Sequence, residues 1–152
     1  MNELKKAYCA GGCFWGIEEN FRTKPGIIST EVGYAGGKDE NVTYEKVCKG
    51  NTGHAETVKI EFDEKIISYE KILDLLFKMH DQTQKNMQYP DVGPQYRSEV
   101  FYVDEKQKNI ASAVKDKFNK TLGGKVVTNI NPLTTYIAAE DYHQKYIMKN
   151  RR

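Results

Sequence analysis

The sequence predicts an α/β (α+β) fold: a two-layer sandwich of the ferredoxin-like plait type, with a mixed sheet and helices on one face. The main observation is that expected strands and helices interleave in the order β-α-β-β-α-β-α-β. A second is that the two long helical segments are each apolar along one side. No repeat, low-complexity stretch or linker interrupts the 152 residues, so we expect one domain over 1–152.

The expected strands are short segments of alternating or continuous apolar character. The clearest covers 55–62, where Val58, Ile60 and Phe62 alternate with polar residues. The full set is 6–10, 27–34, 55–62, 98–103 and 134–138. We also expect the first residues to form an added edge strand.

The expected helices are marked by apolar spacing and by residues that begin or end a helix. Ser68 is a suitable cap for a helix that ends near His80. Asp104 and Gln107 resemble a capping box for a helix that Gly123–Gly124 closes. Shorter helical segments are expected at 17–21, 43–48 and 141–146, and a long polar surface loop at 81–97.

Composition limits the possible partners and compartments. Hydrophobic residues make up 39% and charged residues 29%, and no apolar run approaches the roughly 20 residues of a membrane span. The net charge of +2 comes from interleaved Lys and Glu, so neither nucleic acid nor membrane is an expected partner. The N-terminus lacks the apolar core of a signal peptide, and three cysteines are a poor disulfide framework. We therefore expect a cytoplasmic protein with free thiols.

A candidate nucleophile lies in the stretch Gly11-Gly12-Cys13-Phe14-Trp15-Gly16, where an expected strand turns into an expected helix. Backbone N–H groups and the positive end of the helix dipole favour thiolate over thiol at such a position. The glycines should leave the sulfur room for a substrate. The alternative is that Cys13 is a small buried residue and that Phe14 and Trp15 belong to the core.

Glu56 is the candidate proton donor. It shares the parity of Val58, Ile60 and Phe62, which predicts that its carboxyl points to the buried side of the strand. Burial favours the neutral carboxyl, the form that a general acid needs. Because Glu56 is near the start of the strand, fraying into solvent remains an open alternative. His54 just before it is expected to be exposed.

With Gly53-His54-Ala55-Glu56, the Cys13 stretch resembles the A-type peptide methionine sulfoxide reductases over nearly the whole chain. The resemblance implies a two-layer core and reduction of methionine S-sulfoxide, free or in proteins, through a Cys13 sulfenic acid. It implies that Tyr44 and Tyr96 donate hydrogen bonds near the substrate oxygen. Phe14 and Trp15 would receive the methyl group, and Asp91 would lie near the pocket. No organic cofactor or metal is required, because thiols supply the electrons.

Two other classes are weaker alternatives. Cys13 before an aromatic residue, with His143 far downstream, resembles a papain-like hydrolase, but the second cysteine of that signature is missing. Cys9, Cys13, Cys48 and His54 are zinc-ligand types, but their spacing matches no strong zinc pattern.

The expected reductant is an external thiol, either thioredoxin or glutathione with glutaredoxin. Many members of the resembled family carry resolving cysteines in a C-terminal tail, whereas no cysteine follows Cys48 here. Cys9 lies on a strand and is poorly placed to meet Cys13. Cys48 is the remaining internal candidate, with packing as its expected role. We therefore predict a one-cysteine cycle.

Overall fold

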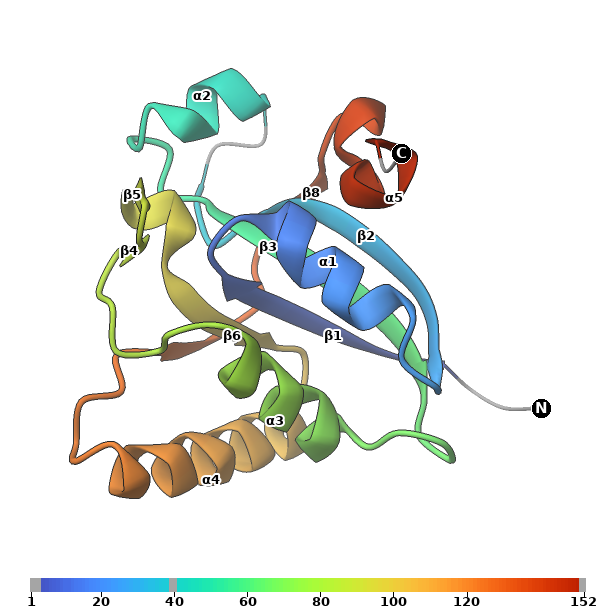
Figure 1. Cartoon of the computed structure of the whole chain (residues 1–152), viewed down its shortest axis with the longest axis vertical. Coiled ribbons are helices and arrows are strands. Elements are labelled where there is room, and N and C mark those ends of the chain that lie inside the picture. The colour runs from blue at the N-terminus through green and yellow to red at the C-terminus, as the bar shows by residue number, and fades with distance from the viewer. Residues whose placement is uncertain (1–3, 39–40, 151–152) are drawn as a thin grey trace.

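The computed structural model describes residues 4–38 and 41–150, which form a curved six-stranded sheet with the strand order β7-β6-β1-β3-β2-β8 (Figure 1). These strands are β1 (Leu4–Gly11), β2 (Ile27–Ala35), β3 (Ala55–Asp63), β6 (Ser98–Tyr102), β7 (Asn129–Pro132) and β8 (Tyr136–Ala138). β6 and β7 are parallel and the other neighbours are antiparallel, so the sheet is mixed. Its four central strands have the plait order, which confirms the predicted fold class.

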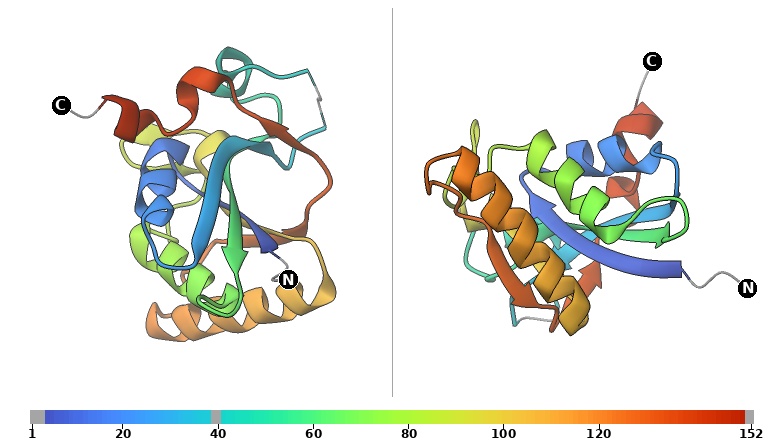
Figure 2. Two further views of the ribbon diagram at one scale, coloured as in Figure 1. Left: turned by 90° about the vertical axis from the view of Figure 1, so that its right-hand side faces the viewer. Right: turned by 90° about the horizontal axis from the view of Figure 1, so that it is seen from below.

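Three helices cover one face of this sheet (Figure 2). They are α1 (Phe14–Arg22), α3 (Tyr69–Met79) and α4 (Glu105–Thr121). The predicted caps are present: Ser68 accepts a hydrogen bond from the Lys71 N–H, and Asp104 accepts one from the Gln107 N–H. Two short helices, α2 (Tyr44–Cys48) and α5 (Tyr146–Asn150), lie near the end of the sheet where α1 begins.

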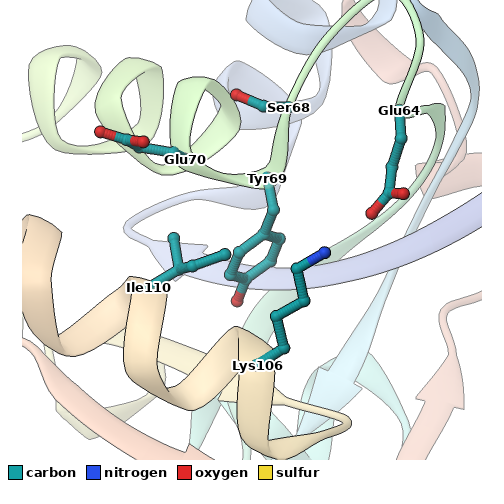
Figure 3. Close-up of a pocket in the computed structure, with 6 residues that line it drawn as sticks. All are labelled: Glu64, Ser68, Tyr69, Glu70, Lys106 and Ile110. Atoms are coloured by element: carbon teal, nitrogen blue, oxygen red, sulfur yellow. The ribbon is translucent and has the colours of Figure 1, made fainter.

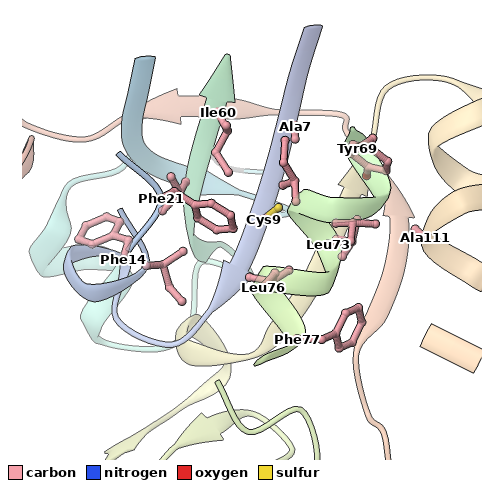
Figure 4. Packing of buried hydrophobic residues seen from close by; sticks show 14 of the residues in the cluster. Ala7, Cys9, Phe14, Phe21, Ile60, Tyr69, Leu73, Leu76, Phe77 and Ala111 are labelled. Carbon is pink, nitrogen blue, oxygen red and sulfur yellow. The ribbon is translucent and has the colours of Figure 1, made fainter. Parts of the chain in front are cut away.

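The core lies between the helices and the sheet (Figure 4). Val58, Ile60 and Phe62 of β3 are fully buried, as their alternation predicts, and Phe14 and Phe21 of α1 cover them from the helical layer. Burying each such large side chain contributes about 1.5–3 kcal/mol to folding. Glu56 has the same parity as these core residues and is the second residue of β3, beside the start of α1.

Several details differ from the sequence prediction. Leu4–Lys6 belong to β1 and pair with β3 in the middle of the sheet, so they are not an added edge strand. β7 was not predicted at all. The expected loop 81–97 contains a small hairpin and a 3-10 turn, β4 (Met87–Gln88), β5 (Asp91–Val92) and η1 (Pro94–Tyr96). The expected terminal helix is a 3-10 turn, η2 (Asp141–His143), followed by α5. Within the described ranges, the helices are all too short or too polar to cross a bilayer.

Candidate active site

Cys13 lies in the two-residue turn between β1 and α1 and is the N-cap of α1, with φ −59° and ψ 123°. Gly12 before it has a φ of 101°, a conformation that strongly favours glycine. A Cβ at Gly11 would come within 2.9 Å of the His80 ring, and one at Gly12 within 2.8 Å of Gln88. The two glycines therefore permit close packing behind the turn, whereas a Cβ at Gly16 would meet nothing within 4 Å.

The pKa of the Cys13 thiol is raised to about 11, contrary to the expected thiolate. Burial is the main cause, and the charges of Glu56 and Asp91 add to it. The backbone N–H groups of Trp15 and Gly16 act in the opposite direction, as the helix N-terminus should. In this environment desolvation and two carboxyl groups outweigh the helix terminus, so the resting Cys13 side chain is a thiol.

Glu56 is only 1% exposed, so the fraying alternative is wrong. Its Oε1 accepts a hydrogen bond of 3.2 Å from the backbone N–H of Phe14, the residue next to Cys13. Its Oε2 is buried and has no hydrogen-bond partner within the described residues. Burial raises the pKa of Glu56 to about 8 against the opposing effect of the Phe14 hydrogen bond, and the Asp91 charge raises it further.

Tyr44, Tyr96 and Asp91 come from three separate segments and meet at this end of the sheet. Burial raises the pKa of both phenols, and the Glu56 charge acts on each in the same direction, so both hydroxyls remain hydrogen-bond donors. The nearby side chain of Cys48 also raises the pKa of both hydroxyls. Cys48 is exposed on α2, so the expected packing role for this residue is wrong.

The rings of Phe14, Trp15, Tyr44 and Tyr146 form an aromatic wall beside Cys13. Phe14 is buried and stacks with Tyr44 at a ring-centroid distance of 6.3 Å, and Trp15 stacks with Tyr44 at the same distance. Trp15 also stacks on Tyr146 at 3.9 Å and donates a 3.0 Å hydrogen bond from Nε1 to Nδ1 of His143. No sequence pattern indicated Tyr146 as part of the site, because its contact with Trp15 joins distant parts of the chain.

His143 does not serve as the base of a cysteine hydrolase. Its Nδ1 accepts from Trp15, so its neutral ring carries the proton on Nε2, and burial lowers its pKa. Its ring packs against Phe14, Trp15, Tyr44 and Tyr142. The hydrogen bond and the ring packing of His143 therefore position the Trp15 indole.

The zinc alternative also loses its geometric basis. Cys9 is fully buried on β1 and Cys48 is exposed on α2. His54 is 1% exposed, contrary to expectation, and accepts a hydrogen bond at Nδ1 from the Gly37 N–H. Among the residues that the structure describes, no group of three or more His, Cys, Asp or Glu side chains could hold a metal ion.

A hollow of about 280 Å³ lies between α3 and α4, with Glu64, Tyr69 and Lys106 among its lining residues (Figure 3). None of the seven candidate side chains lines it, and it contains no thiol. The chemistry therefore gathers at the α1 end of the sheet, where Cys13, Glu56, two tyrosines, Asp91 and an aromatic wall meet.

A cysteine beside a buried neutral carboxyl and phenol donors suits oxygen transfer to sulfur, which is the chemistry of a thiol-dependent oxidoreductase. Comparison with known proteins agrees. A family model described as peptide methionine sulfoxide reductase matches residues 5–152. The peptide methionine sulfoxide reductase MsrA of Pelagibacter ubique is 55% identical over 138 residues, which cover 91% of this chain and 94% of that protein. MsrA of Methanosarcina acetivorans is 51% identical over 148 residues, covering 96% and 79%.

Solved structures show the same likeness. The reduced form of Mxr1 from Saccharomyces cerevisiae has a TM-score of 0.92 and 33% identity, covering 99% of this chain and 87% of that one. Methionine sulfoxide reductase A of Corynebacterium diphtheriae has a TM-score of 0.88 and 33% identity, covering 97% and 75%. The chain belongs to the A-type peptide methionine sulfoxide reductase family, and its activity is the thiol-dependent reduction of methionine sulfoxide.

Proposed function

We propose that the chain reduces the S epimer of methionine sulfoxide, free or within proteins, with Cys13 as nucleophile and Glu56 as general acid. Tyr44 and Tyr96 donate hydrogen bonds to the sulfoxide oxygen. Phe14 and Trp15 receive the methyl group on their apolar faces. Asp91 lies at the pocket, where its charge raises the pKa of both Cys13 and Glu56.

In the proposed step the Cys13 sulfur attacks the sulfoxide sulfur while Glu56 gives its proton to the oxygen. The attack forms a sulfur–sulfur bond, and the proton makes the substrate oxygen a hydroxyl group. The hydroxyl group then bonds to the Cys13 sulfur as the substrate sulfur–oxygen bond and the new sulfur–sulfur bond break, so methionine leaves and Cys13 remains as sulfenic acid. Two electrons pass from the Cys13 sulfur to the methionine sulfur. The proton of the Cys13 thiol returns to Glu56, so the carboxyl is ready for the next cycle.

The observation that carries this mechanism is the state of the Glu56 carboxyl. With a pKa of about 8, it is protonated in roughly nine of ten molecules at pH 7. Because Oε1 accepts from Phe14, the proton lies on Oε2, the oxygen that has no partner within the described residues. The fold thus supports a carboxylic acid with a free donor beside the nucleophile.

An external thiol closes the cycle in this proposal. It attacks the Cys13 sulfenic acid, water leaves, and a second thiol reduces the mixed disulfide. Thioredoxin, or glutathione with glutaredoxin, has the required chemistry. The three cysteines are free thiols in the structure, which fits a reducing compartment such as the cytoplasm. We also propose that 1–152 acts as one reductase domain.

The decisive assay offers the two sulfoxide epimers separately with dithiothreitol and measures the methionine released. The S epimer should be consumed and the R epimer left. The Cys13→Ser variant should lose turnover with its circular dichroism and melting temperature unchanged, because a serine hydroxyl is a far weaker nucleophile at neutral pH. Near-normal activity in that variant, or equal use of both epimers, would refute the proposal.

A further inference from the structure

The segment 139–146, here called the strap, crosses from β8 to the start of α5 and supplies two of the rings around Trp15. Tyr146 stacks on the indole at 3.9 Å with an interplanar angle of 10°. His143 accepts the indole hydrogen bond. The position of Trp15 therefore depends on how the strap is held.

The first half of the strap is fixed to strand β2 and to helix α2. The Gln144 side chain accepts from the Val32 N–H at 2.8 Å and donates to the Val32 carbonyl at 2.9 Å, like an added rung of the sheet. Glu140 accepts hydrogen bonds from the Tyr34 hydroxyl and the Tyr44 N–H. These contacts place His143, but they end one residue before Lys145.

The second half is held by Glu18 of α1, whose carboxylate is 1% exposed, and by the Lys145 ammonium, which donates a 3.1 Å hydrogen bond to the Thr30 carbonyl. Its Oε1 accepts a 2.7 Å hydrogen bond from the backbone N–H of Lys145. Its Oε2 accepts a 2.8 Å hydrogen bond from the Thr30 hydroxyl and lies 3.9 Å from the Lys145 ammonium. Lys145 has a φ of 52°, in the left-handed region that a residue other than glycine rarely adopts, so this conformation needs a partner to hold it.

Tyr146 follows Lys145 directly, and Glu18 is three residues after Trp15 on α1, where side chains are neighbours. One carboxylate thus fixes the backbone of the residue before Tyr146 to the same helix that carries Trp15. We propose that Glu18 is a positioning residue for substrate binding, because it locks Tyr146 onto Trp15 and so shapes the aromatic wall that receives the substrate. This inference rests on the proposed function of Trp15.

Such a role predicts a specific kinetic pattern. In Glu18→Ala, KM for methionine sulfoxide should rise by up to about tenfold, the size of one lost aromatic contact, while kcat changes little. Glu18→Gln keeps the shape but loses the charge that strengthens the hydrogen bond, so KM should rise by about threefold. Tyr146→Leu should raise KM as Glu18→Ala does.

The test that separates positioning from general stability is a double-mutant cycle. If Glu18 acts through Tyr146, adding Glu18→Ala to Tyr146→Leu should raise KM no further. Should Glu18→Ala fail to fold, the cycle is run with Glu18→Gln. The proposal is wrong if the KM increases of the two single variants multiply in the double variant, or if kcat falls while KM is unchanged. It is also wrong if Glu18→Ala does not fold and Glu18→Gln behaves like the wild type.

Two variants serve as matched controls. Lys145→Gly removes the ammonium and its hydrogen bond to the Thr30 carbonyl but keeps the N–H that Glu18 binds and favours the same backbone conformation, so KM should stay near the wild-type value. Glu19→Gln removes a neighbouring, half-buried carboxylate that pairs with Arg22, and KM should not change. If Lys145→Gly matches Glu18→Ala, the ammonium and not the backbone is the anchor, and the proposal is wrong.

A readout independent of activity is available because Trp15 is the only tryptophan in the sequence. Acrylamide should quench its fluorescence more strongly in Glu18→Ala and Tyr146→Leu than in the wild type, Lys145→Gly or Glu19→Gln. Unchanged quenching in Glu18→Ala would overturn the proposal even if the reductase assay succeeds. A wild-type chain without reductase activity would refute the proposed function, while quenching would still decide whether Glu18 holds the strap.

Discussion

Glu56 of β3 and Glu99 of β6 are both buried glutamates of one sheet, but their surroundings are opposite. Glu99 is 3% exposed, with the Arg97 guanidinium at 2.5 Å and the Asn131 amide at 2.8 Å. Glu56 has one backbone N–H and an oxygen without a partner among the described residues. Glu99 therefore takes part in an ion pair and in a hydrogen bond that joins two strands, whereas burial without a cation pushes the Glu56 carboxyl toward its neutral form.

The largest expected effect is the loss of reduction rate in Glu56→Gln. Glutamine keeps the shape and can accept the Phe14 hydrogen bond, but it has no proton to give. The reduction rate should fall by about 10²- to 10⁴-fold, with little change in substrate binding. Single-turnover release of methionine measures the step directly. A loss of only a few fold, with an unchanged pH profile, would show that Glu56 is structural and that the proton has another source.

Glu99→Gln should show the reverse pattern. It removes the ion-pair partner of the half-buried Arg97 guanidinium, which keeps its hydrogen bonds to the Pro94 and Gly53 carbonyls, so the free energy of unfolding should fall by about 2 kcal/mol. Turnover should change far less than in Glu56→Gln. Urea denaturation at pH 7 gives the first quantity and the dithiothreitol assay the second. A stable but inactive Glu99→Gln variant would contradict the comparison.

The pH dependence of stability tests the same contrast at Glu56. Its folded pKa of about 8 lies above the ordinary glutamate value of 4.5, so between these pH values the folded chain holds a proton that the unfolded chain has released. Stability should therefore fall as pH rises through this window, by at most about 1.4 kcal/mol per pH unit. Glu56→Gln should remove this fall and be more stable than the wild type at pH 9. A variant with the wild-type pH dependence would contradict the assignment.

Asp91 offers a smaller and more selective change. Its charge raises the pKa of both Glu56 and Cys13, so Asp91→Asn should lower both. The bend in the pH profile of kcat/KM where Glu56 titrates should then move to lower pH. A profile measured on the wild type and on Asp91→Asn under the same salt conditions is sufficient. A bend that stays in place or moves upward would show that another group sets it.

The sequence predicted the fold because its strongest signals are local. The alternation along β3 and the caps at Ser68 and Asp104 identify elements without knowledge of their partners. β7 was missed because Asn129–Pro132 has no period of its own and becomes a strand only through parallel pairing with β6. The hairpin of β4 and β5 is too short to give a pattern.

For the site, too, local patterns predicted some features and missed others. Parity alone indicated that Glu56 is buried, and the resemblance supplied Tyr44, Tyr96 and Asp91. The expected thiolate at Cys13 was wrong because burial and two carboxyl groups from distant segments determine the pKa. Glu18 and Tyr146 had no sequence signal, since their contacts join α1 to the strap. Local patterns predict elements, and properties that need several elements require the structure.

The smallest expected effect concerns the thiols, where Cys9 and Cys48 contrast as the glutamates do. Cys9 is fully buried and its pKa is raised to about 12, so it supplies no thiolate. Cys48 is exposed and lies beside the hydroxyls of Tyr44 and Tyr96. A disulfide with Cys13 would require the two Cα atoms to come within about 7 Å.

We therefore predict that an external thiol, and not Cys48, attacks the Cys13 sulfenic acid. Turnover of Cys48→Ser with glutathione should equal that of the wild type. The reduced protein is treated with excess methionine sulfoxide without reductant, and intact mass, free thiols and released methionine are measured. A gain of one oxygen with Cys48 still open to alkylation is expected in the wild type and, apart from the alkylation, in Cys48→Ser. A loss of two hydrogens that joins Cys13 to Cys48, and that disappears in Cys48→Ser, would make Cys48 the resolving cysteine.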